Sequence, residues 1–300
     1  MKRTATAAEP QTRWIDVGDG VRLHVLDWGG GGPAVVMLHG AGQSAHVFRT
    51  LAPALDGGLR PVALTFRAHG ESDTPEDGYT VERFAADVVA VLDALHLGQA
   101  ALVGHSLGGT VVTHAAAAAP GRVSHAVYLD ALTDYRGLGR IQARSPARPP
   151  APPSGGDDAA ERAWHRAYLY GTWNEALEAD WLARAAPAVR AHRRELLAEL
   201  VDDAAHTPEP LDRVRCPALA LMAHESVRTQ LPWLEHGDPR LDAARAWLRE
   251  VRTPWRRAAA ERFLREAPRG RVAEIHGNHF FFLTAPGRTA AEIRGFVLST

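Results

Sequence analysis

The chain has 300 residues, 46% of them hydrophobic, and a formal net charge of −1. This length allows one large domain with an inserted segment, and the apolar share is ample for a hydrophobic core. A nearly neutral chain gives no reason to expect nucleic acid or an anionic membrane as a partner, so we expect a small-molecule substrate. The single cysteine, Cys216, excludes an internal disulfide and fits a reducing compartment.

No targeting or membrane-spanning segment is evident in the sequence. Residues 1–11 are polar and alanine-rich and lack the apolar core of a signal peptide. No run of about 18 apolar residues occurs, so we expect no membrane span and a cytoplasmic location. Composition gives no information on the oligomeric state.

The N-terminal part of the chain predicts strands followed by a helix. Residues 14–26 predict a hairpin around Gly18-Asp19-Gly20, since glycine and aspartate favour tight hairpin turns. The apolar runs at 34–38 and 62–66 are typical of buried strands in a parallel sheet. Residues 79–95 predict a helix, because their apolar side chains recur every three or four positions.

The most informative stretch is Gly-His-Ser-Leu-Gly at 104–108, which follows the apolar run at 100–103. An alanine-rich continuation to residue 119 completes the order strand, sharp turn, helix. The glycines permit a strained backbone and leave room for a close helix crossing. Such a turn lifts the Ser106 hydroxyl clear of the sheet, beside a helix N-terminus that favours developing negative charge. Ser106 is therefore the candidate nucleophile.

Two upstream loops add to this pattern. His39-Gly40-Ala41-Gly42 follows the first buried run, and Arg67-Ala68-His69-Gly70-Glu71-Ser72 follows the second. Together with the G-x-S-x-G turn, these loops resemble the α/β-hydrolase family over residues 14–132 and 213–298, with an alanine at 68 where the family has glycine. The resemblance implies an α/β fold: a mostly parallel central sheet flanked by helices, with a helical cap inserted after the sixth strand.

The resemblance also implies an oxyanion hole and a catalytic base. The oxyanion hole would use the backbone N–H groups of Ala41 and Leu107. The family places its catalytic histidine seven residues before a proline, and His279 has this spacing to Pro286. His276 competes for the role of base but lacks the spacing. A metal site made by the two histidines has no supporting carboxylate or cysteine cluster, so we expect no metal and no cofactor.

The acidic member of the site has two candidates. In many family members the acid follows the strand after the cap; here that register falls on Ser226, and Glu225 lies one residue early. A subset of the family places the acid at the end of the strand after the nucleophile helix, and Asp130 has that place. Asp130 lies 24 positions after Ser106, a step that brings both to the same edge of the sheet. We favour Asp130 as the partner of His279 and retain Glu225 as the alternative.

An insertion separates the two parts that resemble the family. We expect core regions at 1–132 and 213–300 and a helical cap over Ser106 at 133–212. The proline-rich stretch at 145–156 predicts an extended loop. Such caps often line a pocket with apolar side chains, which favours a largely apolar substrate.

Two further segments lie outside these motifs. Arg190, Arg193 and Arg194 form a charge run that we interpret as the solvent-exposed face of a helix. Residues 239–267 are rich in charge, have helical periodicity and predict a second excursion from the core.

The elements together predict a serine hydrolase acting on a small to medium, largely apolar ester or related carbonyl compound. Ser106 would attack, His279 would act as base, and Asp130 would hold the imidazole tautomer. A serine nucleophile argues against haloalkane dehalogenase or epoxide hydrolase chemistry, where the family uses aspartate at this turn. Two alternatives remain: a cofactor-free lyase or tailoring enzyme that uses the same residues for acid–base chemistry, and a ligand receptor with a hydrolase fold.

Overall fold

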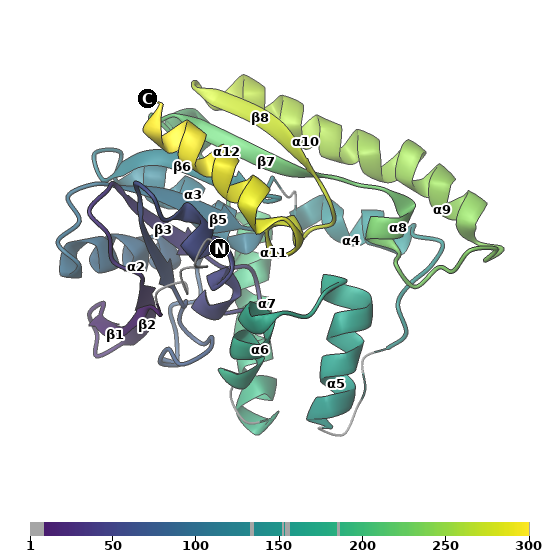
Figure 1. Ribbon diagram of the computed structural model, residues 1–300, viewed down its shortest axis with the longest axis horizontal. Coiled ribbons are helices and arrows are strands. Elements are labelled where there is room, and N and C mark those ends of the chain that lie inside the picture. The colour runs from purple at the N-terminus through teal and green to yellow at the C-terminus, as the bar shows by residue number, and fades with distance from the viewer. Residues whose placement is uncertain (1–8, 133–134, 152, 154–156, 185–186, 300) are drawn as a thin grey trace, which may run out of the picture.

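One twisted sheet forms the centre of the molecule in the computed structural model, which describes residues 9–132, 135–151, 153, 157–184 and 187–299 (Figure 1). The strands follow the order β1-β2-β4-β3-β5-β6-β7-β8. They are β1 (Gln11–Asp16), β2 (Arg22–Asp27), β3 (Ala34–Leu38), β4 (Arg60–Leu64), β5 (Ala100–His105), β6 (Val123–Leu129), β7 (Ala218–His224) and β8 (Gly270–His276). β2 pairs antiparallel with both β1 and β4, and the remaining neighbours, from β4 to β8 in this order, pair parallel. The expected α/β architecture is confirmed.

Helices cover both faces of the sheet, and their bounds are as follows. They are α1 (Leu51–Leu55), α2 (Val81–Ala94), α3 (Leu107–Ala118), α4 (Tyr135–Ala143), α5 (Asp158–Trp164), α6 (Glu175–Leu182), α7 (Pro187–His206), α8 (Val227–Gln230), α9 (Leu241–Trp247), α10 (Thr253–Glu266), α11 (Phe281–Thr284) and α12 (Pro286–Leu298). Single helical turns also form at η1 (Ala45–Phe48) and η3 (Leu211–Arg213), and wider π-helical turns at η2 (His165–Tyr170) and η4 (Leu248–Arg252).

The strand sequences explain why the sheet is buried on both faces. Side chains of neighbouring strand residues point to opposite faces, so a strand covered on both sides must be apolar throughout. In β5, Leu102 packs in one core cluster with residues of α2 and α3, whereas Val103 packs in a second cluster with residues of α1 and α12. Both side chains are fully buried. The apolar run before the G-x-S-x-G turn therefore marks a central strand.

The predicted hairpin is confirmed, and one predicted strand is shifted. β1 pairs with β2 across the tight turn at 18–20, where both glycines have positive φ angles. The strand expected at 62–66 is β4 and covers Arg60–Leu64. Thr65 therefore lies beyond the strand: its backbone N–H donates to the His24 carbonyl, while its hydroxyl accepts from the Ala45 N–H.

Four helices, α4 to α7, lie between β6 and β7 in the insertion expected to form a cap. Figure 1 shows α5, α6 and α7 projecting from one side of the sheet. The second half of α7 is part of the core, because Leu196 and Leu200 are buried in the same cluster as Leu107 and Val111 of α3. Part of the proline-rich stretch, at 152 and 154–156, falls outside the described residues.

The second excursion, predicted at 239–267, contains α9, η4 and α10 and leads into β8. Figure 1 shows these helices as one long rod beside β7 and β8. Phe263 of α10 is fully buried and packs against Tyr128 of β6. None of the helices in the described ranges combines the length and apolarity that a bilayer crossing requires.

Candidate active site

The G-x-S-x-G sequence forms a tight turn between β5 and α3. Ser106 has φ 51° and ψ −121°, a conformation that L-residues rarely adopt outside such turns. A Cβ atom on Gly104 would overlap the Gly108 carbonyl, and one on Gly108 would overlap the Leu38 carbonyl. Glycine is therefore required at both positions for the helix to approach the strands, and this approach presents Ser106 at the carboxyl end of β5.

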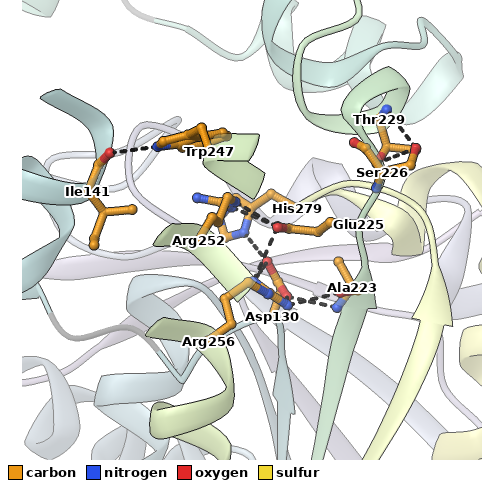
Figure 2. Close-up of polar contacts among 10 residues, drawn as sticks. All are labelled: Asp130, Ile141, Ala223, Glu225, Ser226, Thr229, Trp247, Arg252, Arg256 and His279. Atoms are coloured by element: carbon orange, nitrogen blue, oxygen red, sulfur yellow. Dashed lines mark hydrogen bonds and ion pairs between the residues drawn. The ribbon is translucent and has the colours of Figure 1, made fainter. Parts of the chain in front are cut away.

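His279 and Asp130 are brought together by the folded chain. Asp130 follows β6, and His279 lies in the loop after β8, 149 residues further on. The distance from His279 Nδ1 to Asp130 Oδ2 is 2.7 Å (Figure 2), and the carboxylate oxygen accepts the Nδ1 proton. This contact leaves Nε2 as the proton-accepting nitrogen of a neutral imidazole. The His279 side chain is 32% exposed, whereas that of Asp130 is buried.

Two further donors hold the Asp130 carboxylate. Its Oδ1 accepts from the backbone N–H of Ala223 at 2.8 Å and from Arg256 Nη2 at 2.6 Å (Figure 2). Burial alone would raise the pKa of Asp130, but Arg256 and His279 lower it well below its usual range. The carboxyl group is therefore ionised at neutral pH and able to stabilise an imidazolium.

The alternative acid, Glu225, has other partners. Arg252 forms a bidentate pair with it, at 2.6 and 2.7 Å, and Arg256 lies 3.3 Å from Glu225 Oε1. Figure 2 shows its carboxylate directed at these arginines. Ser226, the position of the usual family aspartate, caps α8 through its hydroxyl. Of the two candidate acids, the structure brings Asp130 to His279.

A second histidine supports the His279 loop. His105, which precedes Ser106, is buried, and its Nε2 lies 3.0 Å from the His279 carbonyl oxygen. Its Nδ1 lies 3.1 Å from Gln43 Oε1, in the loop after β3. Burial and the neighbouring His279 lower the pKa of His105 well below its usual value, so it is neutral at pH 7. No spacing pattern in the sequence predicts this support.

The competing histidine, His276, takes part in a different group. It ends β8, is exposed, and its ring lies 5.9 Å from the ring of His224. His224 in turn contacts Glu274 at 2.9 Å. Asp130 contacts His279 and not His276 in the described part of the chain.

Ser106, Asp130 and His279 line one cavity of about 660 Å³, which we call the elbow cavity. Tyr135, the first residue of α4, also lines it, and burial raises the pKa of this phenol. Apolar walls come from Trp247 and Trp255 of the second excursion and from Trp164 and Leu169 of the insertion. Trp233, which follows α8, completes them. Neither Tyr135 nor the contribution of the second excursion was anticipated, because both depend on how distant segments dock.

The two residues expected to form an oxyanion hole lie on either side of the turn. Leu107 is the first residue of α3, where a backbone N–H has no partner within the helix. Ala41 lies in the loop after β3, which His39 holds in place. His39 Nδ1 donates to the Gly40 carbonyl at 2.7 Å, and its Nε2 accepts from the Phe66 N–H at 3.0 Å.

The interpretation of the arginine run as a solvent-exposed face is wrong for Arg193. This half-buried side chain donates to the carbonyl oxygens of Gly70 and Ser72 and to the Thr74 hydroxyl, at 2.8 to 3.2 Å. It thereby ties α7 to the loop after β4. The charge run could not reveal this, because the acceptors lie about 120 residues away in the chain.

One cluster in the described ranges has a composition that metals favour: His24, His46 and Glu71, whose potential ligand atoms lie within 4.8 Å of one another. Hydrogen bonds account for this cluster. Arg49 donates to His46 Nδ1 at 3.1 Å, so His46 carries its proton on Nε2 and donates it to Glu71 at 2.8 Å. Burial lowers the pKa of His24.

A family model described as the alpha/beta hydrolase fold matches residues 33–178. The chain has the α/β-hydrolase fold. The crystal structure of E-2-(acetamidomethylene)succinate hydrolase superposes on this α/β-hydrolase chain with a TM-score of 0.70. That match covers 96% of this chain and 99% of the other at 22% identity, and it shows the shared fold.

Two curated proteins resemble this α/β-hydrolase chain more closely over shorter stretches. It is 39% identical over 121 residues to a non-heme chloroperoxidase of Streptomyces lividans, covering 39% of this chain and 44% of that protein. It is 36% identical over 119 residues to 2-(acetamidomethylene)succinate hydrolase of Mesorhizobium japonicum, covering 40% and 42%. The matched region thus spans less than half of the length of either relative.

Proposed function

We propose that the protein is a serine hydrolase that cleaves a carboxylic ester or a related carbonyl compound through a covalent acyl-enzyme. The observation that carries the proposal is the 2.7 Å contact between His279 Nδ1 and Asp130 Oδ2, in a cavity that Ser106 also lines from a strained turn. The proposed partner is a small molecule rather than nucleic acid or a membrane, and the expected location is the cytoplasm.

The proposed reaction has two stages. His279 Nε2 takes the proton of the Ser106 hydroxyl as Oγ attacks the carbonyl carbon, and Asp130 stabilises the imidazolium. When the tetrahedral intermediate collapses, the ester C–O bond breaks and His279 returns the proton to the leaving alkoxide. Water, deprotonated by the same imidazole, then attacks the acyl-enzyme and releases the acid and free Ser106.

The backbone amides of Ala41 and Leu107 are proposed to bind the oxyanion. They suit this role because backbone donors in a rigid turn are oriented before the charge develops. Loss of one such donor costs about 3 kcal/mol of transition-state stabilisation in comparable sites. The helix N-terminus at Leu107 favours the same negative charge.

The first prediction concerns Ser106→Ala. Hydrolysis of 4-nitrophenyl esters of graded chain length is expected to fall by about 10³-fold or more, since the nucleophile is removed while the fold is kept. Ser124→Ala on β6 is the matched control and should retain turnover. Retention of full activity in Ser106→Ala would refute the proposal.

A covalent adduct separates acyl transfer from pure acid–base chemistry. A fluorophosphonate probe should add one probe mass to the wild-type chain and none to Ser106→Ala, as measured by intact-mass spectrometry. A lyase or receptor that forms no acyl-enzyme is expected to show no ester turnover. Ester turnover lost in Ser106→Ala together with the adduct supports the hydrolase, and absence of both in the wild type contradicts it.

A further inference from the structure

A second cavity, of about 690 Å³, lies next to the elbow cavity and is rich in arginine. Trp164 and Leu169 line both cavities, and Ala41, one of the proposed oxyanion donors, lines the second. Its cationic side chains all belong to the insertion: Arg184, Arg190, Arg193 and Arg194. We call this space the arginine cavity. Among the described residues that line it, only Glu161 and Asp180 carry carboxyl groups.

Both of these carboxyl groups already have partners. Glu161 lies 3.4 Å from Arg190, which also pairs with Asp158 at 3.0 Å, and 3.8 Å from Arg184. Asp180 is buried and accepts from the Ser44 hydroxyl at 2.7 Å. Burial raises the pKa of Asp180, which weakens it as a counter-charge. The two imidazoles in the lining, His69 and His165, have lowered pKa values because of burial and add no positive charge at pH 7.

Arg193 is left without an anionic partner. Its three hydrogen bonds go to two backbone carbonyls and a hydroxyl, all of them neutral acceptors. Across the described residues no carboxylate comes within ion-pair distance of it. The half-buried guanidinium thus has neutral hydrogen-bond acceptors, and Glu71, whose charge also acts on it, is itself paired with His46. An incoming carboxylate could therefore form a charge-assisted contact with Arg193. Arg194, one residue on, adds a second cation to the same lining.

We propose that the arginine cavity binds a carboxylate of the substrate, so that the protein acts on esters that carry a free carboxylate on the acyl side. The inference deepens the proposed ester hydrolysis and rests on it. A carbonyl at Ser106 would have its oxygen on the Ala41 amide, and the acyl chain would continue past Ala41 toward Arg193. The apolar walls of the elbow cavity would then take the leaving group.

The test compares two esters of the same acyl length and leaving group. 4-Nitrophenyl hydrogen glutarate carries a terminal carboxylate, and 4-nitrophenyl pentanoate does not. The wild type is expected to prefer the glutarate ester by about 10-fold or more in kcat/KM, as for a charge-assisted hydrogen bond. In Arg193→Gln and Arg194→Gln this preference should fall, mainly through KM for the glutarate ester.

Two control variants accompany the test. Arg193 also supports the loop after β4, so loss of the preference in Arg193→Gln could come from damage to that loop. Arg194→Gln separates the two causes, because within the described residues the hydrogen bonds to that loop come from Arg193 and not from Arg194. Arg166→Gln is the matched control, because Arg166 is an exposed arginine of the same insertion and does not line the cavity. The control should keep the wild-type preference.

A binding measurement separates the two proposals. Ser106→Ala should bind free glutarate in isothermal titration calorimetry, and adding Arg193→Gln should weaken Kd by about 10-fold or more. Turnover of both esters at equal kcat/KM, with no glutarate binding, overturns the arginine cavity and leaves ester hydrolysis standing. Glutarate binding that depends on Arg193, with neither ester hydrolysed, supports the cavity and overturns the hydrolase.

Discussion

Asp130 receives more direct support than any other polar side chain of the candidate site. It binds an imidazole with one carboxylate oxygen and accepts from a backbone amide and Arg256 with the other. Arg256 in turn contacts Glu225, which Arg252 neutralises. Each buried charge in this chain of residues thus lies next to an opposite charge. The pairing offsets the cost of removing the charges from water, which is high for an isolated charge. These contacts keep the Asp130 carboxylate ionised and hold it in one orientation toward His279.

The two candidate acids give a direct prediction. Asp130→Asn keeps the shape of the site but removes the anion that stabilises the imidazolium, so kcat for 4-nitrophenyl esters should fall by about 10³- to 10⁴-fold. Glu225→Gln should leave kcat within about 10-fold of the wild type, because Glu225 contacts arginines rather than the imidazole. Steady-state kinetics of both variants decide between them, and the opposite order of effects would identify Glu225 as the acid.

At the scale of elements, the turn between β5 and α3 depends on close backbone contact. Gly108 lies against the carbonyls of Leu38 and His39, at the end of the neighbouring strand β3. The same approach brings the start of α3 near the loop that contains Ala41. The strained φ of Ser106 persists because strand and helix are both buried around it.

Gly108→Ala tests this dependence. The added methyl group would overlap backbone atoms that cannot move independently of β3, so the free energy of unfolding should fall by about 3 kcal/mol or more. Gly295→Ala in α12 is the matched control, since a Cβ there meets no atom within 4 Å. The control should raise stability by about 0.5–1 kcal/mol, because alanine favours the helix. Urea denaturation measures both, and equal stability of the two variants would contradict the packing argument.

The sequence predicted the elements whose signals are local. Apolar runs, the glycines around Ser106 and the hairpin turn each lie within a few residues, and the structure confirms the strands and the turn. Asp130 could be selected because parallel strands end at the same edge of a sheet. Arg256 could not, since it lies 126 residues from Asp130 on a helix whose docking depends on tertiary packing. Arg193 was misjudged for the same reason.

At the scale of the whole molecule, several buried histidines are held neutral. Burial lowers the pKa of His69 to about 4, and it lowers those of His39 and His105 well below the usual value. The unfolded chain therefore binds more protons than the folded one between about pH 6.5 and pH 4. Stability from these groups is complete above about pH 6.5 and is lost as the pH falls through this window.

Urea unfolding at pH 8, 6.5 and 5 should show this loss. The lowered pKa of His69 alone corresponds to a loss of at most about 3 kcal/mol in the free energy of unfolding as the pH falls from 6.5 to 4. His69→Gln should be less stable at pH 8 but should lose less stability between pH 6.5 and pH 5. His192→Gln, at an exposed position of α7, should follow the wild-type curve. A His69→Gln curve parallel to that of the wild type would contradict the assignment.

Because α7 is buried in the main core, the whole insertion cannot be replaced by that of a related protein without exposing core residues. Leu196 and Leu200 cover Leu107 and Val111, and Asp203 accepts from the Val81 N–H at the start of α2. Excising residues 133–212 would strip apolar cover from α3, the helix that follows Ser106, and the shortened chain is expected to aggregate. A chimaera that keeps α7 and replaces only the preceding helices would preserve this cover, so its splice points belong before residue 187.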